Sequence, residues 1–584
     1  MMNFGKDVIV GIDFGTSGIG YCYSFESNVN SITLSDLPGQ SADRKVPTEI
    51  ILDNQLESVL AFGSQCSGYI LGKEKEEYEY FKDIKMNLYN DIYLIKSTNG
   101  RVASIETIIT KILEIISNNA FNQIKRANKF VEKEDIKWVL TVPAIWGEKS
   151  KQIMIDASIR AGLIDENIDK SLFLALEPEV AGIYFYISSL TNSNYQCVFI
   201  SDGKPYIICD IGAGTVDICT HKRIMEDKVT KGLYEEYPPI GGDFGGHKIN
   251  EEFIRRLIIP LFGEENVQKL KEKSKDNEDW VEFENQIEEL KKDYSVNQNE
   301  FLTLNCDLFN EDDNPKNLEY YISGYNQKDL HFKYEIKKNK NWKLRISGKI
   351  FSDIIKELAQ KIFSKIEEIY NSVKTERIIL TGAGSNNKVL IDYICCLAEE
   401  KNILLDTITP TQPEISIMKG AVLFGFQNDI IRKRKAKYTL GIKSAYEWKE
   451  KYEGKGIKKY EEINGKYYCV NLFYKFITRN DYIDFDKIIE HKFNAANPNP
   501  ELIFYKTYRK NCEYIDEKDE NGNLIIEEFG KVRFDIGEDF DANKREVTIK
   551  MKWGETYIDV CAIYKKKRKK VKCYSLLSKI NNYL

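Results

Sequence analysis

Two short segments of this chain place an apolar run, an aspartate and a glycine-rich turn in the order that phosphate binding requires. They are residues 8–18, VIVGIDFGTSG, and residues 207–217, IICDIGAGTVD. Glycine lets the backbone turn tightly and bring N–H groups close to phosphate oxygens. Asp13 and Asp210 end the two apolar runs, and because phosphate repels a carboxylate, their expected partner is hydrated Mg²⁺. Two such hairpins facing each other would hold one nucleoside triphosphate, although either one alone is also a common turn at the corner of a sheet.

The elements that must position these hairpins alternate between strands and helices up to about residue 427. Apolar residues recur at helical spacing over 105–121 and 351–373, and buried strands are predicted at 138–143 and 377–380. This alternation predicts mixed sheets covered by helices. Over 438–564 the pattern changes to short alternating runs separated by turns, which predict an all-β domain.

The composition indicates a globular protein of several domains. The chain has 584 residues, 42% of them hydrophobic, and a net charge of −6 from 84 basic and 90 acidic side chains. Because both signs are interspersed, we expect neither nucleic acid nor a membrane as partner. No apolar run is long enough to span a bilayer, and a first strand that begins by Val8 leaves no room for a signal peptide. The 12 scattered cysteines form no Cys-x-x-Cys pair, which favours reduced thiols and a cytoplasmic, or alternatively nuclear, location.

Further motifs lie between the two hairpins and after them. They are, in chain order, Thr141-Val142-Pro143-Ala144, Leu176-Glu177-Pro178-Glu179, Gly241-Gly242-Asp243-Phe244, Leu380-Thr381-Gly382-Ala383-Gly384 and Pro413-Glu414. With these motifs the chain resembles the seventy-kilodalton heat-shock protein family of the actin-like ATPase superfamily, and most of all its divergent member 12 branch. The resemblance covers the chain apart from its C-terminal tail. It implies a two-lobed α/β actin-like ATPase with ribonuclease H-like subdomains over residues 1–427, followed by an all-β sandwich over 438–564 that binds a substrate or partner. The implied cofactors are ATP or ADP and Mg²⁺.

The resemblance also implies roles in ATP hydrolysis. Asp13 and Asp210 would hold Mg²⁺ through water, while Glu177 and Asp217 would orient or deprotonate the attacking water together with Asp210. Phosphoryl transfer needs little beyond such positioning and charge neutralisation. Lys85 is the best match for the cation at the γ-phosphate, although Lys82 could take that place and either could be a solvated helix side chain. The phosphates would be bound by backbone and hydroxyl groups of Gly15, Thr16, Ser17, Gly212, Ala213, Gly214, Thr215, Gly241 and Gly242.

Adenosine would lie between two further elements. The first is a helix face with Glu288, Lys291, Lys292 and Ser295 at i, i+3, i+4 and i+7, a pattern that an ordinary surface helix also shows. The second is the turn Gly382, Ala383, Gly384, Ser385 and Asn386, where glycine would let a flat base approach the backbone. Glu414 belongs to the matching Pro413-Glu414 motif.

Three segments depart from the family pattern. The family's acidic, leucine-rich linker is replaced by a basic linker, 428–437, and the basic tail 565–584 is too short for a full helical lid over a peptide groove. The region 297–342 is longer than expected and predicts extra strands, without a catalytic or metal-binding pattern.

Two functions fit these features. The first is an ATP-hydrolysing chaperone-like protein whose β-domain binds unfolded or extended polypeptide through backbone hydrogen bonds, together with co-chaperones. The second is a nucleotide-binding scaffold or adaptor with little ATPase activity that recruits a specific protein client. A small-molecule kinase of the same superfamily fits less well, because the β-domain stands where a second sugar-handling half would be. The retained acids favour hydrolysis, whereas the altered linker and the missing lid favour the scaffold.

Overall fold

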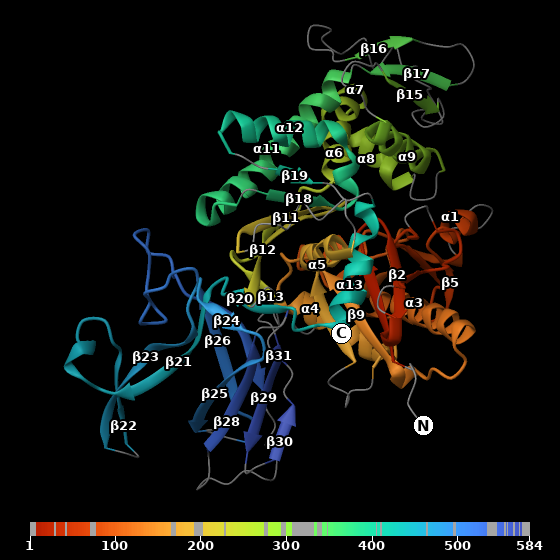
Figure 1. Cartoon of the computed structure of the whole chain (residues 1–584). Helices are drawn as coiled ribbons and strands as arrows, with labels where there is room; N and C mark the ends of the chain where they lie inside the picture. Colours follow the sequence, from red (N-terminus) through yellow and green to blue (C-terminus); the bar gives the residue numbers. More distant parts are fainter. Residues whose placement is uncertain are drawn as a thin grey trace.

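The computed structural model of the chain is a mixed α/β structure with several sheets and a β-rich C-terminal region (Figure 1). Among the described residues, no helix is long and apolar enough to cross a bilayer. The structure describes residues 7–28, 31–40, 44–70, 77–164, 171–191, 203–226, 229–273, 278–293, 300–305, 332–335, 341–346, 348–375, 377–403, 406–408, 412–462, 465–494, 498–533, 546–553, 556, 559–564, 567–570 and 573–574.

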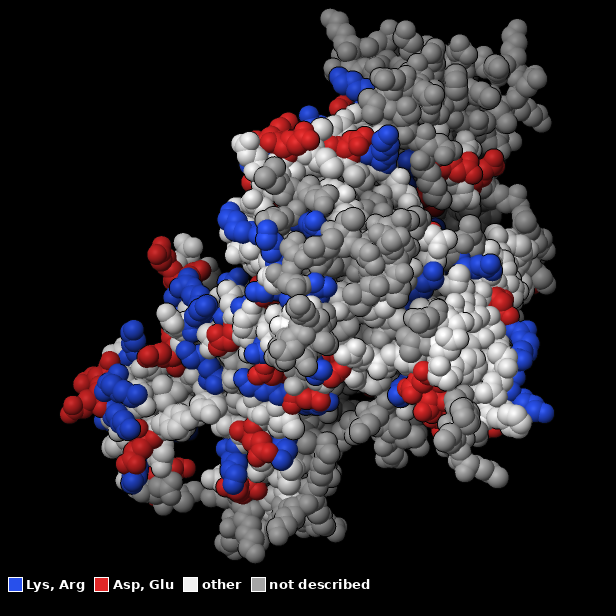
Figure 2. Space-filling model, in the orientation of Figure 1, with Lys and Arg blue, Asp and Glu red and all other residues white. Residues whose placement is uncertain are grey.

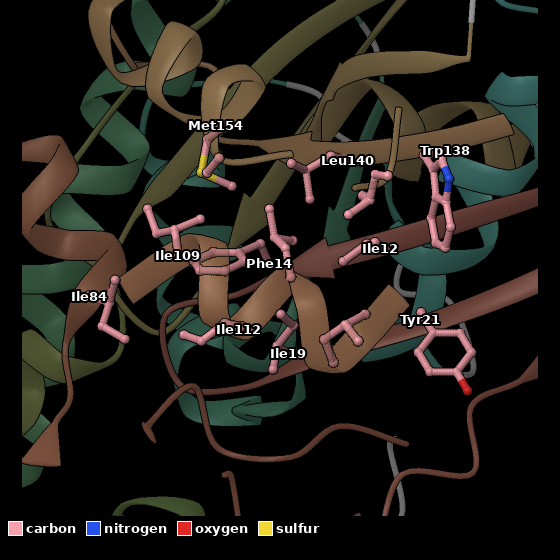
Figure 3. Close-up of a cluster of buried hydrophobic side chains, with 14 of the residues drawn as sticks. Ile12, Phe14, Ile19, Tyr21, Ile84, Ile109, Ile112, Trp138, Leu140 and Met154 are labelled. Atoms are coloured by element: carbon pink, nitrogen blue, oxygen red, sulfur yellow. The ribbon is translucent and has the colours of Figure 1, made fainter. Parts of the chain in front are cut away.

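A five-stranded sheet of order β10-β9-β1-β2-β3 carries the first hairpin. Alternate residues of β1 enter two cores: Ile12 and Phe14 pack with the helix α3 on one face (Figure 3), and Ile9 joins a second core on the other. Both faces are therefore covered, which explains why the strand is apolar throughout. The bounds are β1 Val8–Phe14, β2 Ile19–Phe25, β3 Thr33–Leu34, β9 Ile136–Val142, β10 Leu172–Leu176, α3 Ile105–Ala127 and α4 Glu148–Arg160.

An eight-stranded sheet of order β19-β18-β11-β12-β13-β20-β24, with β14 paired to β12, carries the second hairpin. Helices that include α6, α9, α11 and α12 share a core with one face of its strand β11. The strand bounds are β11 Pro205–Ile211, β12 Val216–Glu226, β13 Val229–Glu235, β14 Ile240–Gly242, β18 Arg377–Thr381, β19 Asp406–Ile408, β20 Ile431–Lys435 and β24 Tyr482–Asp484. The helix bounds are α6 His247–Phe253, α7 Ile259–Phe262, α8 Glu264–Lys273, α9 Glu278–Asp293, α11 Gly348–Val373 and α12 Lys388–Glu400.

Five strands of each sheet follow the same topology. In the first sheet β1 is antiparallel to β2 and parallel to β9, β2 is antiparallel to β3, and β9 is parallel to β10. In the second, β11, β12, β13, β18 and β19 repeat this order and these directions. The two glycine-rich turns therefore occupy equivalent positions, each between the first and second strand of its sheet.

Two helices, α5 (Glu177–Thr191) and α13 (Ser416–Phe426), lie between the sheets (Figure 1). They share one core with Ile9 and Val139 of the first sheet and Ile208 and Cys219 of the second. Their backbones are in close contact, because a Cβ atom on Gly420 would overlap the backbone of Val180. This packing fixes the start of α5, where Glu177 lies.

Smaller elements form further short sheets that are separate from these two. The region 297–342, for which extra strands were predicted, contributes most of a three-stranded sheet of order β15-β17-β16, which confirms that prediction. The bounds are α1 Gln65–Ile70, α2 Ile84–Tyr89, β4 Ile50–Leu52, β5 Val59–Phe62, β6 Glu79–Phe81, β7 Leu94–Lys96, β8 Val102–Ser104, β15 Glu300–Asn305, β16 Phe332–Glu335 and β17 Asn341–Ile346.

The C-terminal region forms two sheets, of order β22-β23-β21-β26-β27-β31 and β25-β28-β29-β30. They share one hydrophobic core, to which Leu440 and Phe504 contribute from one sheet and Ile549 and Met551 from the other. The bounds are β21 Thr439–Glu447, β22 Lys458–Glu461, β23 Lys466–Ile477, β25 Lys487–Asn494, β26 Glu501–Thr507, β27 Glu527–Arg533, β28 Glu546–Trp553, β29 Asp559–Tyr564, β30 Lys567–Lys570 and β31 Cys573–Tyr574.

Two segments differ from their sequence-based interpretation. The segment 428–437, interpreted as a linker, contains β20, which pairs with β13 on one side and β24 on the other. The tail 565–584 contains the short strands β30 and β31, each paired at a sheet edge, and its remaining residues lie outside the described ranges. In both places a run rich in Lys and Arg was interpreted as a linker or a tail, whereas such a run can also pair along its backbone with a neighbouring strand.

Candidate functional site

The two glycine-rich turns close in the same way. The N–H of Gly15 donates to the carbonyl of Gly18 at 3.1 Å, and the N–H of Gly212 donates to the carbonyl of Thr215 at 2.9 Å. Asp13 and Asp210 are each the next-to-last residue of the strand before the turn. The predicted hairpins are thus present, with equivalent aspartates.

The turns also lie against each other. A Cβ atom placed on Gly214 of the second turn would be 2.7 Å from Oγ1 of Thr16 in the first turn, and would also meet Sδ of Met86. Thr16 and Thr215 are buried. Only a glycine at position 214 therefore allows the two turns to approach this closely.

Four carboxylates converge on the facing turns: Asp13, Glu177, Asp210 and Asp217, all of them buried. Burial, reinforced by the neighbouring carboxylates, raises the pKa of Asp210 well above its usual range. Burial likewise raises the pKa of Glu177 to about 7, although the ammonium of Lys85 opposes the shift. These four acids influence one another, so the structure brings the predicted catalytic and metal-binding acids into one site.

Lys85 is the buried cation of this site. It is 3% exposed, and its ammonium forms an ion pair with Oε1 of Glu177. Lys82, the other candidate, has an exposed side chain whose ammonium lies 3.6 Å from Glu284 on α9. Of the two candidates, Lys85 is the one whose ammonium lies beside one of the four carboxylates, so its position favours it as the cation predicted for the γ-phosphate.

Asp217 is held from the first sheet. The N–H of Ile145, in the segment that follows β9, donates to Oδ1 of Asp217 at 3.1 Å, and the side chain of Thr215 also hydrogen-bonds to this carboxylate. Gly241 lies opposite Asp217 in the β12–β14 pair and Gly242 opposite Val216. Burial raises the pKa of Asp217, and these hydrogen bonds oppose the rise.

The acids fit a hydrated divalent cation. Oδ2 of Asp13, Oδ1 of Asp210 and Oδ2 of Asp217 are buried and accept no hydrogen bond among the described residues. Carboxylate oxygens are the ligands that Mg²⁺ prefers. No group of three acidic, His or Cys side chains that could hold a metal ion is found in the described ranges. Mg²⁺ commonly keeps several of its waters when it binds to carboxylates.

A second lysine, which the sequence interpretation missed, lies at Asp13. The ammonium of Lys45 is 2.7 Å from Oδ2 of Asp13, and the hydroxyl of Thr141 lies 3.5 Å from Oδ1. Lys45 belongs to the segment between β3 and β4 and follows no recognisable motif. Its proximity to Asp13 arises from tertiary packing across the hairpin.

The predicted adenosine elements attach to the second turn from two sides. Nζ of Lys291 donates to the carbonyl of Gly246 at 3.3 Å, and the N–H of Gly246 donates to the carbonyl of Gly212 at 3.0 Å. Lys291 also pairs with Glu288. Lys292 lies in α9, but its side chain is outside the described part, as is the whole of Ser295. The role of these residues stays a prediction.

The turn 382–386 packs against the end of β11. Gly382 has φ of +79°, and a Cβ atom there would overlap Oδ1 of Asp210. A Cβ atom on Gly384 would be 2.9 Å from the carbonyl of Ile211. Ala383, Ser385 and Asn386 form one turn of 3₁₀ helix with it, which contacts the turn Pro413–Ile415 that contains Glu414. Both glycines allow a close approach to the site that a side chain would block.

The remaining predicted residue, Ser17, is exposed within the first turn. At the surface, Lys and Arg side chains alternate with Asp and Glu over the face shown in Figure 2, as the balanced charge of the sequence predicts.

The fold and site described above are those of an α/β protein whose relatives are heat-shock 70 kDa proteins. No protein-family model matches the chain. Among curated proteins it is similar to heat shock 70 kDa protein 12A of Mus musculus and of Homo sapiens, with 24% identity over 625 and 626 aligned positions that cover 95% of this chain and 89% of each relative. It is also similar to heat shock 70 kDa protein 12B of Homo sapiens, with 23% identity over 630 aligned positions and the same coverage. These matches confirm the resemblance to the divergent member 12 branch that the motifs indicated.

Proposed function

We propose that the chain binds ATP with Mg²⁺ between its two glycine-rich turns and hydrolyses it to ADP and phosphate. The observation that carries this proposal is the convergence of Asp13, Glu177, Asp210 and Asp217 on two identically closed turns, with the buried Lys85 among them. The similarity to heat shock 70 kDa proteins 12A and 12B supports it, because the resemblance to that family implies an ATP site. The repeated strand order of the two sheets supports a two-lobed, actin-like arrangement over residues 1–427.

Each side chain has a role that its surroundings allow. Thr16, Thr215 and the backbone of both turns bind the phosphates. The Lys85 ammonium neutralises charge that develops on the transferred phosphoryl group. Glu177, whose pKa is raised to about 7, accepts a proton from water near neutral pH, and Asp217 orients that water.

Asp210 and Asp217 would hold Mg²⁺ through water, with Asp13 at the other turn. When bound, this ion would neutralise the phosphate oxygens and so favour attack by water. A cation at this place also lowers the pKa of Asp210, whose burial otherwise favours the protonated form.

The test is a measurement of ATP hydrolysis with wild type, Asp210→Asn and Glu177→Gln. We expect slow, Mg²⁺-dependent turnover in wild type and a loss of at least 100-fold in each variant, in keeping with the removal of one preorganised group. Asp156→Asn, in the helix α4 away from the turns, is a control that should keep wild-type turnover. Equal turnover in all four proteins would disprove the enzyme proposal.

We further propose that the β-rich region, residues 438–564, binds extended polypeptide or a specific client protein. The two-sheet core of this region supports a sandwich that could present strand edges to a peptide. On this proposal the protein is chaperone-like and works with polypeptide or co-chaperone partners.

The second candidate is a nucleotide-binding scaffold with little turnover, and one observation favours it. The strand β20, where a basic linker was predicted, is paired on both sides, and its Arg434 contacts the buried Glu179 and Glu235. A fixed connection would leave the β-rich region insensitive to nucleotide. Titration of an unfolded peptide with and without ATP separates the two candidates: a change in peptide affinity supports the chaperone cycle, and unchanged affinity supports the scaffold.

A further inference from the structure

The ammonium of Lys45 lies beside Asp13, the residue of the first hairpin that is expected to face a cation. Its Nζ is 2.7 Å from Oδ2 of Asp13, which is the carboxylate at the end of β1. The Asp13 side chain is almost fully buried and that of Lys45 is 16% exposed. A partly exposed ammonium is therefore paired with a buried carboxylate.

The backbone around Lys45 is fixed to the phosphate-binding turn. Ile19 and Val46 exchange two backbone hydrogen bonds, of 2.8 and 2.9 Å. The hydroxyl of Thr48 donates to the carbonyl of Gly15 at 2.8 Å, so the segment is attached at both ends of the turn. Lys45 is thus held by main-chain contacts on the turn itself.

The residue before Lys45 has an unusual conformation. Arg44 has φ of +61°, which is uncommon for a residue with a side chain and costs on the order of 1 kcal/mol or more. Its carbonyl accepts a hydrogen bond from the hydroxyl of Ser35 at 2.9 Å, which stabilises this backbone. Such a conformation persists only where the surrounding structure imposes it. Here the conformation of Arg44 directs the chain so that the next residue, Lys45, pairs with Asp13.

Two glycines make room for the Lys45 side chain. A Cβ atom on Gly18 would lie 3.3 Å from Cβ of Lys45, and one on Gly20 would lie 3.1 Å from its Cγ. The aliphatic part of Lys45 therefore runs over backbone without side chains, beside the turn. Gly18 is the last residue of the predicted phosphate motif, and Gly20 lies two residues further on. A side chain at either position would press against Lys45, which is a second physical reason for glycine there.

The carboxylates of the site outnumber the lysines that pair with them among the described residues. Four buried carboxylates face two lysines, Lys45 and Lys85, and Lys85 is paired with Glu177. Oδ2 of Asp13, Oδ1 of Asp210 and Oδ2 of Asp217 are all buried and accept no hydrogen bond among the described residues. Oδ2 of Asp13 differs from the other two because the ammonium of Lys45 lies 2.7 Å away and forms an ion pair with it. The cation expected between the turns therefore fits the second turn, and a fixed ammonium serves the first.

We propose that Lys45 is a built-in cation for the phosphates at the first turn, so that this chain binds nucleoside di- and triphosphates even without a divalent metal ion. This inference rests on the proposed nucleotide site. A lysine ammonium carries three N–H donors, so one that pairs with Asp13 can also donate to a phosphate oxygen. Its charge-assisted hydrogen bonds act without metal, while Mg²⁺ adds to binding through the second turn.

The test is calorimetric titration of ADP and of ATP into the full chain, once with excess Mg²⁺ and once with EDTA. We expect wild type to lose less than about tenfold in affinity when Mg²⁺ is removed. Lys45→Met should lose about 10- to 100-fold in EDTA, the range of a charge-assisted hydrogen bond, and Lys45→Arg should recover most of this loss. Lys137→Met, which removes a half-exposed lysine paired with Glu26 on the same sheet, is the matched control.

The outcomes separate this inference from the proposed function. If wild type binds neither nucleotide with Mg²⁺, the proposed function is wrong. If wild type binds only with Mg²⁺, and Lys45→Met binds the Mg²⁺ complex as well as or better than wild type, then Lys45 merely occupies a metal position and this inference alone is overturned. Thermal unfolding of each variant identifies a variant that loses binding because it does not fold, and Lys45→Arg then decides the question.

Discussion

At the scale of single residues, the buried pair of Lys85 and Glu177 leads to a prediction about which lysine serves the site. Lys85→Met leaves the Glu177 carboxylate buried without its cation, so the pKa of Glu177 rises further and the side chain becomes protonated at neutral pH. We expect at least 100-fold slower hydrolysis and a lower melting temperature. Lys82→Met removes an exposed side chain with a long contact to Glu284 and should change either value very little. Equal losses in the two variants would contradict the assignment.

The residue scale also shows what local sequence can reveal about the site. Asp13, Asp210 and the two turns follow from strand, aspartate and glycine in sequence, because such a turn is a local structure. Lys45 could not be found in this way, since its neighbours form no motif and its contact with Asp13 exists only after distant segments pack. The choice between Lys82 and Lys85 depended on which side chain is buried. The sequence does not show this, because the two lysines lie only three residues apart on a short segment.

At the scale of elements, the contact between α5 and α13 leads to a prediction about stability. A methyl group on Gly420 would overlap the backbone of Val180, so Gly420→Ala must push the two helices apart. Overpacking of this kind costs about 1–3 kcal/mol or more, and it shifts the start of α5 with Glu177. We expect a lower melting temperature together with weaker nucleotide binding.

The control for this prediction is another helical glycine, Gly68 in α1, which has open space where its Cβ would lie. Gly68→Ala should leave stability unchanged or raise it by about 0.5–1 kcal/mol, because alanine favours the helix. A Gly420→Ala protein as stable as wild type would show that the helices are not in close contact.

The elements differ in how far their sequences predict them. The helices α3 and α11 and the strand β9 were predicted closely, because their apolar residues follow the period of the element. The strand β20 was not predicted, because its four successive basic residues were interpreted as part of a linker. Burial of Arg434 against Glu179 and Glu235 makes this strand possible, and these partners are far away in the sequence.

At the scale of the whole molecule, β20 and β24 extend the second sheet toward the β-rich region. β24, between β23 and β25 of the two C-terminal sheets, pairs with β20 in the second sheet. Thr556, between β28 and β29, contacts the first half of the chain as well: its hydroxyl donates to the carbonyl of Leu174 at 2.7 Å, and its carbonyl accepts from Lys151 at 2.8 Å. The β-rich region is thus joined to the rest by sheet pairing and by buried hydrogen bonds.

Arg434 is central to this connection, and its removal gives a prediction for the whole molecule. Its guanidinium donates to Oε2 of Glu179 at 3.0 Å and lies 3.7 Å from Glu235, whose pKa burial raises to about 8. Arg434→Met takes the cation away from the buried Glu179 and one nearby charge away from Glu235, and loss of one partner in a buried pair costs about 3–5 kcal/mol. We expect a lower melting temperature and faster thermolysin cleavage within 428–437.

Lys433→Met is the matched control, because the neighbouring Lys433 is half-exposed and pairs with the exposed Asp484 at 3.3 Å. Its removal should change the melting temperature and the cleavage rate only slightly. If ATP slows the cleavage of wild type within 428–437 but not that of Arg434→Met, the buried ion pair transmits nucleotide binding to β20, because Glu179 lies two residues after Glu177 on α5. If ATP has no effect on the cleavage of wild type, the connection is fixed and the scaffold is the better description. If Arg434→Met and Lys433→Met are cleaved equally fast without ATP, the ion pair does not hold β20 in the sheet.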